Sequence, residues 1–122
     1  MREFPRTARL NHLIQEIVAE EIERLDDERL GFLTVVAAEV EPDLRHATVW
    51  YTSLLDHGDD PQDVEDAAAA VAAALEEARR GVQAAIARQA RLKRTPELLF
   101  RPDPVLRQAE RVETILRELG PQ

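Results

Sequence analysis

The residues of this sequence that are best suited to chemistry are basic side chains gathered in one stretch. Between residues 79 and 101 the chain holds seven basic residues against one glutamate, a net of +6, although the whole chain carries −8. A guanidinium group can pair a phosphate through two hydrogen bonds, so such a stretch suits a polyanion. The candidates for polyanion binding are Arg79, Arg80, Arg88, Arg91, Lys93 and Arg94.

A helix is predicted to position most of these side chains. On a helical wheel, Arg80, Arg88 and Arg91 fall on one arc, opposite an apolar seam. Arginines on the solvent face of a helix often serve only to keep that face soluble. The pattern alone therefore does not distinguish a binding surface from an ordinary solvent-exposed face. The seam comprises Val71, Leu75, Ala78, Val82 and Ile86.

Composition limits the classes of protein that this chain can belong to. Its 122 residues predict a single domain over residues 1–122, and the absence of cysteine disfavours an oxidising compartment and thiolate chemistry. The longest apolar stretch has nine residues, whereas a bilayer span needs about twenty, so we expect a cytoplasmic protein without a membrane partner. The net charge of −8 opposes indiscriminate binding to nucleic acid, although a local basic cluster can still act at contact.

The first half of the chain predicts a helix followed by a hairpin. Apolar residues at three- and four-residue steps predict an amphipathic helix over Thr7–Leu25. From Phe32 the period changes to two, and two strands joined by a short turn at residues 42–44 predict an antiparallel hairpin that ends near Leu54.

The alternation in the hairpin predicts which face of the sheet is wet. We expect Val36, Ala38 and Val40 to share one face, and Glu39, Thr48 and Thr52 to lie on the wet face. Trp50 would then lie outside the sheet or under a terminal segment. An exposed tryptophan can stack on a base or anchor a partner, but more often it packs beneath a helix.

The second half of the sequence predicts a third strand, with helices before and after it along the chain. The acidic run at residues 56–67 is a solvated linker rather than a metal loop, and within it Asp60 and Pro61 start a helix. Gly81 is expected to divide that helix in two, with a bend or a close approach of a partner, and the second piece to run over residues 82–91. A strand over residues 97–101 and a final helix after Asp103 complete the order α-β-β-α-α-β-α.

Two stretches of the sequence together carry a resemblance to a known family. The first comprises residues 30–35 (LGFLTV) and 40–44 (VEPDL), followed by Ala47, Val49 and Tyr51. The second is residues 91–100 (RLKRTPELLF), a basic-leucine-basic run directly before Thr-Pro-Glu-Leu. The first resembles the hairpin of the ribosome-binding factor A family, and the second resembles that family's signature before its last strand. The resemblance covers about residues 5–119.

The resemblance implies a fold and a partner. The fold would be an α+β, type II KH-like domain, α-β-β-α-α-β with a C-terminal helix and a three-stranded sheet with helices packed on one face. The function would be binding of the immature small (30S) ribosomal subunit through 16S rRNA, with help in late maturation and rRNA processing. Ribosomal proteins are possible further partners, and we expect a monomer that uses no cofactor, metal or small-molecule substrate.

The resemblance also implies roles for particular residues. Arg91, Lys93 and Arg94 match the family's basic run, whereas Arg79, Arg80 and Arg88 come from the helical wheel. The family has Ala-x-Gly at the helix pair, so Ala78 is the expected kink and Gly81, one place late, an expected contact. Arg6 and Arg9 would extend the RNA-binding surface. Asp27-Glu28-Arg29 stands where the family often has Asp-Pro-Arg, and we expect that difference to affect only a loop.

Two other classes of function are weighed against RNA binding. The sequence offers little support for catalysis, because no nucleophile is paired with any of its histidines. These are His12, His46 and His57, which are predicted on a helix face, at a strand start and in a loop. An acidic protein-protein interaction module without RNA binding is the alternative. Reversal of the arginine charges separates this module from an RNA-binding domain.

Overall fold

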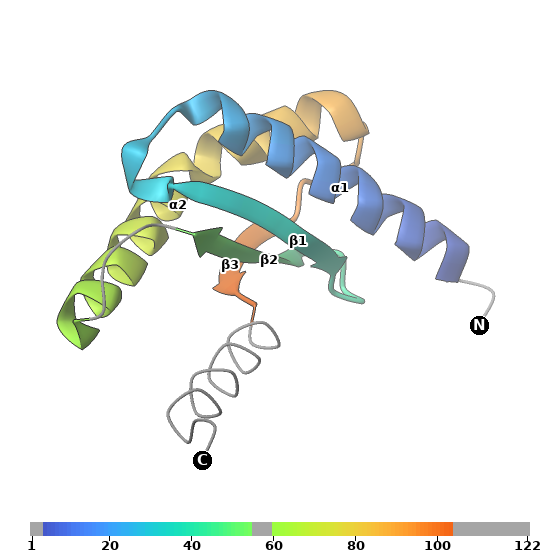
Figure 1. Cartoon of the computed structure of the whole chain (residues 1–122). Coiled ribbons are helices and arrows are strands. Elements are labelled where there is room, and N and C mark those ends of the chain that lie inside the picture. The colour runs from blue at the N-terminus through green and yellow to red at the C-terminus, as the bar shows by residue number, and fades with distance from the viewer. Residues whose placement is uncertain (1–3, 55–59, 104–122) are drawn as a thin grey trace, which may run out of the picture.

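A three-stranded mixed sheet with helices on one face organises the molecule. The computed structural model describes residues 4–54 and 60–103. Strand β2 lies in the centre, antiparallel to β1 as predicted and parallel to β3, and α1 and α2 pack on the same side of the sheet (Figure 1). These features confirm the predicted α+β fold. The elements are α1 (Phe4–Leu25), η1 (Glu28–Leu30), β1 (Phe32–Val40), β2 (His46–Leu54), α2 (Pro61–Ala90) and β3 (Glu97–Pro102). The predicted final helix after Asp103 lies outside the described residues.

The core lies between the two helices and the sheet. Helix α1 contributes an apolar stripe because its aliphatic residues recur every three or four positions, as the sequence predicts. Its polar side chains hold β1 in place: Asn11 Oδ1 accepts a hydrogen bond from the Val40 N–H at 2.9 Å, and Gln15 Nε2 donates to the Val36 carbonyl at 3.2 Å. Core residues of the described chain with no exposed surface include Ile14, Val18, Ala47, Val49, Leu75, Ala85 and Ile86.

A β-bulge changes the predicted face of β1. Val35 pairs with Tyr51 and Ala37 with Trp50, so Val36 is an extra residue between them. An extra residue reverses the alternation on one side of the bulge. Val35 is therefore buried and Val36 is 42% exposed, so the prediction that Val36 shares the face of Ala38 and Val40 is wrong.

The outer face of the sheet is only partly wet. Glu39 is exposed as predicted, and Thr52 and Trp50 are half-buried. Thr48 is only 8% exposed, which corrects its assignment to the wet face. It lies in the central strand, where Glu39 of β1 and Leu99 of β3 flank it in register.

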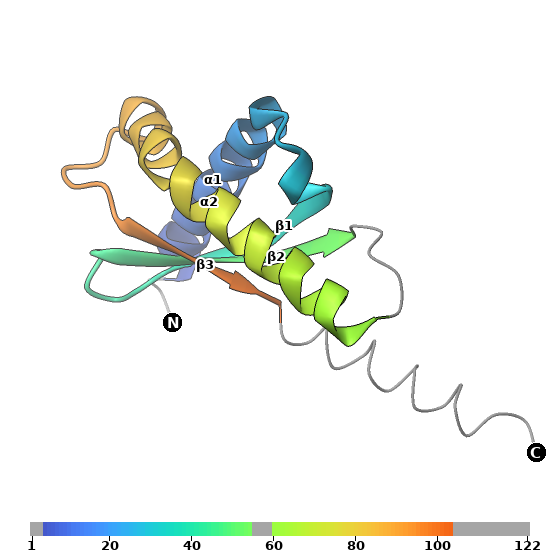
Figure 2. The same ribbon diagram turned by 90° about the vertical axis from the view of Figure 1, so that its left-hand side faces the viewer.

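Helix α2 begins as predicted but is not divided. Asp60 Oδ1 accepts the Gln62 N–H at 2.9 Å and Pro61 occupies the first turn. The prediction of two helices is wrong, because α2 continues through Gly81 to Ala90. A methyl group at Gly81 would meet no atom within 4 Å, so no described segment approaches it closely. Figures 1 and 2 show instead that the axis of α2 bends near its middle.

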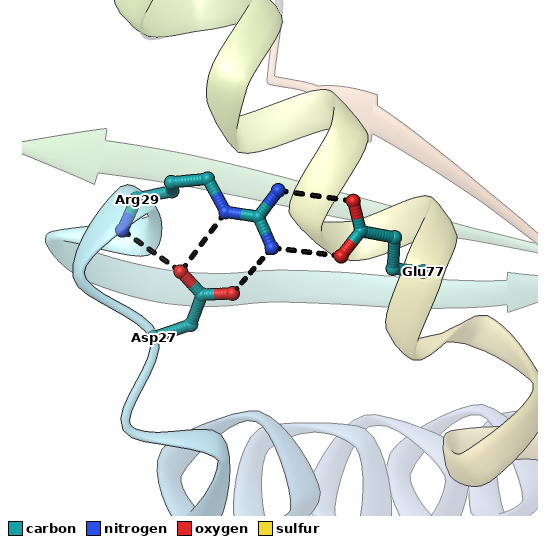
Figure 3. Close-up of polar contacts among 3 residues, drawn as sticks. All are labelled: Asp27, Arg29 and Glu77. Atoms are coloured by element: carbon teal, nitrogen blue, oxygen red, sulfur yellow. Dashed lines mark hydrogen bonds and ion pairs between the residues drawn. The ribbon is translucent and has the colours of Figure 1, made fainter.

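An arginine ties the segment after α1 to the middle of α2. Arg29 of η1 donates to Asp27 (Nη2 to Oδ2, 2.7 Å) and to Glu77 of α2 (Nη2 to Oε1, 2.8 Å; Nη1 to Oε2, 3.0 Å) (Figure 3). Its backbone N–H also donates to Asp27, which caps η1. Asp27 and Arg29 thus fix η1 against α2. Glu28, the residue that differs from the family's Asp-Pro-Arg, takes no part in these contacts, so the expectation that the difference affects only a loop stays a prediction.

This link predicts a pH-dependent contribution to stability. The hydrogen bonds from Arg29 lower the pKa of both Asp27 and Glu77. A lowered folded-state pKa stabilises the protein above the unfolded pKa, and that stability is lost as pH falls through the folded value. Arg29→Gln should therefore lower the free energy of unfolding at pH 7, and the difference from wild type should shrink below about pH 4. Urea unfolding across this range measures it. Arg29→Lys, which keeps the charge but loses the fork, should restore only part of the difference, and a pH-independent difference would contradict the assignment.

Candidate nucleic-acid interface

Two arginines of α2 project from the face opposite the buried seam. Val71, Leu75, Val82 and Ile86 are at most 3% exposed and Ala78 packs against the core, which confirms the seam. Arg80 and Arg88 are exposed and form no ion pair with any residue that the structure describes. Both guanidinium groups are therefore available to an anion.

Arg79 is in a different state. Its side chain is 29% exposed and forms ion pairs with Glu76 and, at 3.5 Å from Nη1 to Oε2, with Glu97. The hydrogen bond to Glu76 raises the pKa of Arg79. An RNA phosphate would have to displace these carboxylates, so the role of Arg79 in binding stays a prediction and is less direct than that of Arg80.

The basic run after α2 is held in an exposed loop. The helix ends at Ala90, one residue earlier than predicted, and Arg91 is its C-cap with a left-handed backbone (φ 53°). Arg91 therefore does not lie on the helical arc with Arg80 and Arg88, where the wheel placed it. Arg91, Lys93 and Arg94 are all exposed, and none pairs with an acidic residue in the described ranges.

A basic residue that the sequence prediction missed joins this loop. Arg45 lies in the turn between β1 and β2 and lines the same groove as Lys93 and Arg94. Its carbonyl accepts the Glu97 N–H at 2.8 Å, which fixes the turn beside the start of β3. The five exposed cations Arg45, Arg88, Arg91, Lys93 and Arg94 are called the basic end below.

The remaining candidates are not part of the basic end, and one of them lies partly outside the described residues. Arg9 is exposed on α1, whereas the side chain of Arg6, near the start of α1, lies outside the described residues. Gly81 is exposed on α2 and Ala78 is half-buried, without a break in the helix between them. Their contacts with RNA and the role of Ala78 as a kink stay predictions.

The two histidines that the structure describes each lie near acidic side chains. His12 Nε2 lies 2.8 Å from Glu16 on α1, and His46 lies 3.7 Å from Asp43 and 3.8 Å from Glu97. His57 lies outside the described residues. Within residues 4–54 and 60–103, no three His, Asp or Glu side chains gather in a way that could hold a metal ion. No helix in the same ranges is long and apolar enough to span a bilayer.

The mixed three-stranded sheet covered by helices on one face, with a basic run after the second helix, agrees with the KH-like domain that the resemblance implied. The family model described as "Ribosome-binding factor A" matches residues 6–116, so the chain belongs to the ribosome-binding factor A family. Proteins of that name from Rubrobacter xylanophilus and Acidothermus cellulolyticus are 40% and 45% identical to it. The matches cover 94% and 95% of this chain and 88% and 73% of the relatives.

A solved structure and a fitted homology model of a family member share the fold. The crystal structure of ribosome-binding factor A from Thermus thermophilus is 33% identical, with a TM-score of 0.64 over 79% of this chain and 94% of that one. A homology model of the Thermus thermophilus protein, fitted into a cryo-EM map of a complex with the 30S subunit, is 31% identical. Its TM-score is 0.57, and the match covers 75% of this chain and 88% of that one.

Proposed function

We propose that this protein binds the immature small ribosomal subunit through 16S rRNA and assists its late maturation and rRNA processing. It acts by binding rather than by catalysis, as a cytoplasmic monomer with a single domain. The observation that carries the proposal is the basic end: five exposed cations, none paired with an acidic residue of the described chain. The Thermus thermophilus relative, placed in a complex with the 30S subunit, supports the same partner.

The distribution of charge gives the bound state one preferred orientation. The chain carries −8 overall, and the exposed acids include Glu16, Glu20 and Glu23 on α1 and Asp63, Glu65 and Asp66 on α2. These carboxylates repel phosphates, whereas the basic end attracts them at contact. An rRNA surface is therefore tolerated at the basic end and disfavoured along the acidic faces.

Sedimentation with purified immature and mature small subunits across a salt series tests the proposal. Neutralisation of about five phosphates releases their counterions, so the binding constant should fall as roughly the third to fifth power of salt concentration. Immature subunits should bind more tightly than mature ones. Binding that does not depend on salt would contradict an rRNA interface and favour the acidic protein-protein module.

A further inference from the structure

The basic end surrounds a groove whose walls are apolar. The groove has a volume of about 470 Å³ and lies between the N-terminal half of α1, the turn between β1 and β2, and the loop between α2 and β3. Its volume falls within the range of about 300–1,000 Å³ that is usual for small-ligand sites. The apolar residues that line it are Leu10, Val40, Leu44, Leu92 and Pro96.

Most of this wall is fixed by the core. Val40 and Pro96 are buried, and Leu10 and Leu92 pack against the core cluster. The Val40 N–H is held by Asn11 at 2.9 Å. A groove built on such residues exists before a ligand arrives, so binding would not have to order its floor.

Leu44 is held out at the mouth of the groove by a strained turn. Its φ of 61° lies in the left-handed region, which a leucine rarely adopts. The turn imposes this conformation, because the Leu44 N–H donates to the Glu41 carbonyl and the Arg45 N–H donates to Asp43 Oδ1, each at 2.8 Å. Leu44 nevertheless remains 57% exposed, so its burial in the core does not explain the strain.

The rim of the groove carries a positive charge. Arg45, Lys93 and Arg94 line it, and Asp43 is the one acidic residue that does so among the described residues. An apolar slot with cations around it matches one part of a nucleic acid chain: a base turned out of its stack with phosphates on either side. A buried apolar protein side chain would not make use of three cations.

We propose that this groove binds a single unstacked base of the small-subunit rRNA. The base lies against Leu44 and Leu92, and the flanking phosphates pair with Lys93, Arg94 and Arg45. This inference rests on the proposed function and deepens it, because it adds a base-binding subsite to a surface otherwise defined by phosphate contacts. Phosphate contacts set affinity, whereas a captured base fixes the register of the RNA.

Leu44→Asn tests the subsite. Asparagine adopts the left-handed conformation more readily than leucine, so urea unfolding should show a variant at least as stable as wild type. Its affinity for immature small subunits should fall about tenfold, because loss of one base contact is expected to have roughly that effect. The salt dependence should stay unchanged because no charge is lost, whereas Lys93→Gln should lower the salt exponent by about one.

Chemical probing of the rRNA identifies the ligand as a base. Dimethyl sulfate reports on adenine and cytosine, and a water-soluble carbodiimide on uracil and guanine. Wild type should protect at least one base that Leu44→Asn leaves reactive. Phe32→Asn is the matched control, because Phe32 is 81% exposed at the start of β1 and does not line the groove. It should bind and protect as wild type does.

Three outcomes would overturn the inference. If Leu44→Asn binds as tightly as wild type, the groove makes no energetic contribution. If affinity falls but base reactivities stay the same, the groove holds a protein side chain of the subunit. In both cases salt-dependent binding by wild type would leave the proposed function standing. If wild type binds no subunits at all, the proposed function fails as well.

Discussion

Arg88→Glu combined with Arg91→Glu is expected to reduce the affinity for immature small subunits by at least about a hundredfold, with the fold retained. Each substitution removes a charge-assisted phosphate contact and adds a repulsive carboxylate, and each lost contact contributes about 1.5–3 kcal/mol. Both side chains are exposed and form no ion pair with the rest of the described chain. The free energy of unfolding should therefore fall by no more than about 1 kcal/mol. The main cause of this small loss would be the carboxylate in place of Arg88, because it would lie at the negative end of the helix dipole.

A matched control separates local charge from net charge. Arg24→Glu with Arg101→Glu changes the net charge by the same amount, and both of these arginines are exposed on other parts of the surface. Sedimentation at fixed salt should show a much smaller loss for this control. Equal losses for the two double variants would mean that the overall field governs binding, and no loss for Arg88→Glu with Arg91→Glu would favour the acidic interaction module.

The periodicity of the sequence predicted most of the fold. The spacing of Ile14, Ile17 and Val18 places them on one helical stripe, and all three are buried. The buried face of an amphipathic helix follows from the spacing of apolar residues along that helix, so it can be found from a single sequence. The bulge at Val36 could not be found in this way, because both of its neighbours are apolar and either register satisfies the pattern.

Contacts between distant segments set the limits of that prediction. Arg45 was missed because the parallel pairing of His46 with Glu97 brings the first turn beside the basic loop. Nothing in the local pattern encodes a pairing across 51 positions of sequence. Arg79 was grouped with the free arginines although one of its partners, Glu76, lies three residues before it on the same helix, a spacing at which helical side chains can pair. Only the second partner, Glu97, lies on another element and could not be found from local pattern.

Gly81 shows a different limit, that of propensity. A glycine in a helix costs about 1 kcal/mol relative to alanine, which suggested a break. Continuous backbone hydrogen bonding and the burial of Val82 and Ala85 just beyond it outweigh that cost, so the helix continues. The arginines on either side of Gly81, Arg80 and Arg88, are thus carried by one continuous helix.

Ile86→Ala is expected to have the largest effect on stability while leaving the binding surface in place. Ile86 is fully buried on α2, and truncation of a buried isoleucine to alanine costs about 2–5 kcal/mol because it leaves a cavity. This is a large share of the roughly 5–15 kcal/mol that stabilises a domain. Urea unfolding at 25 °C measures the loss, and Ile86→Val should show only about 0.5–1.5 kcal/mol of it.

The same variant separates the role of the core from that of the charges. Ile86 lies two residues before Arg88 but faces the opposite side of α2, so the folded fraction of Ile86→Ala still presents the basic end. At low temperature its affinity for small subunits should therefore stay within about threefold of wild type, since a destabilised but still folded protein loses little binding-competent population. A loss of affinity as large as that of Arg88→Glu with Arg91→Glu would show that the basic end depends on the packing beneath it, and not only on the charges that it carries.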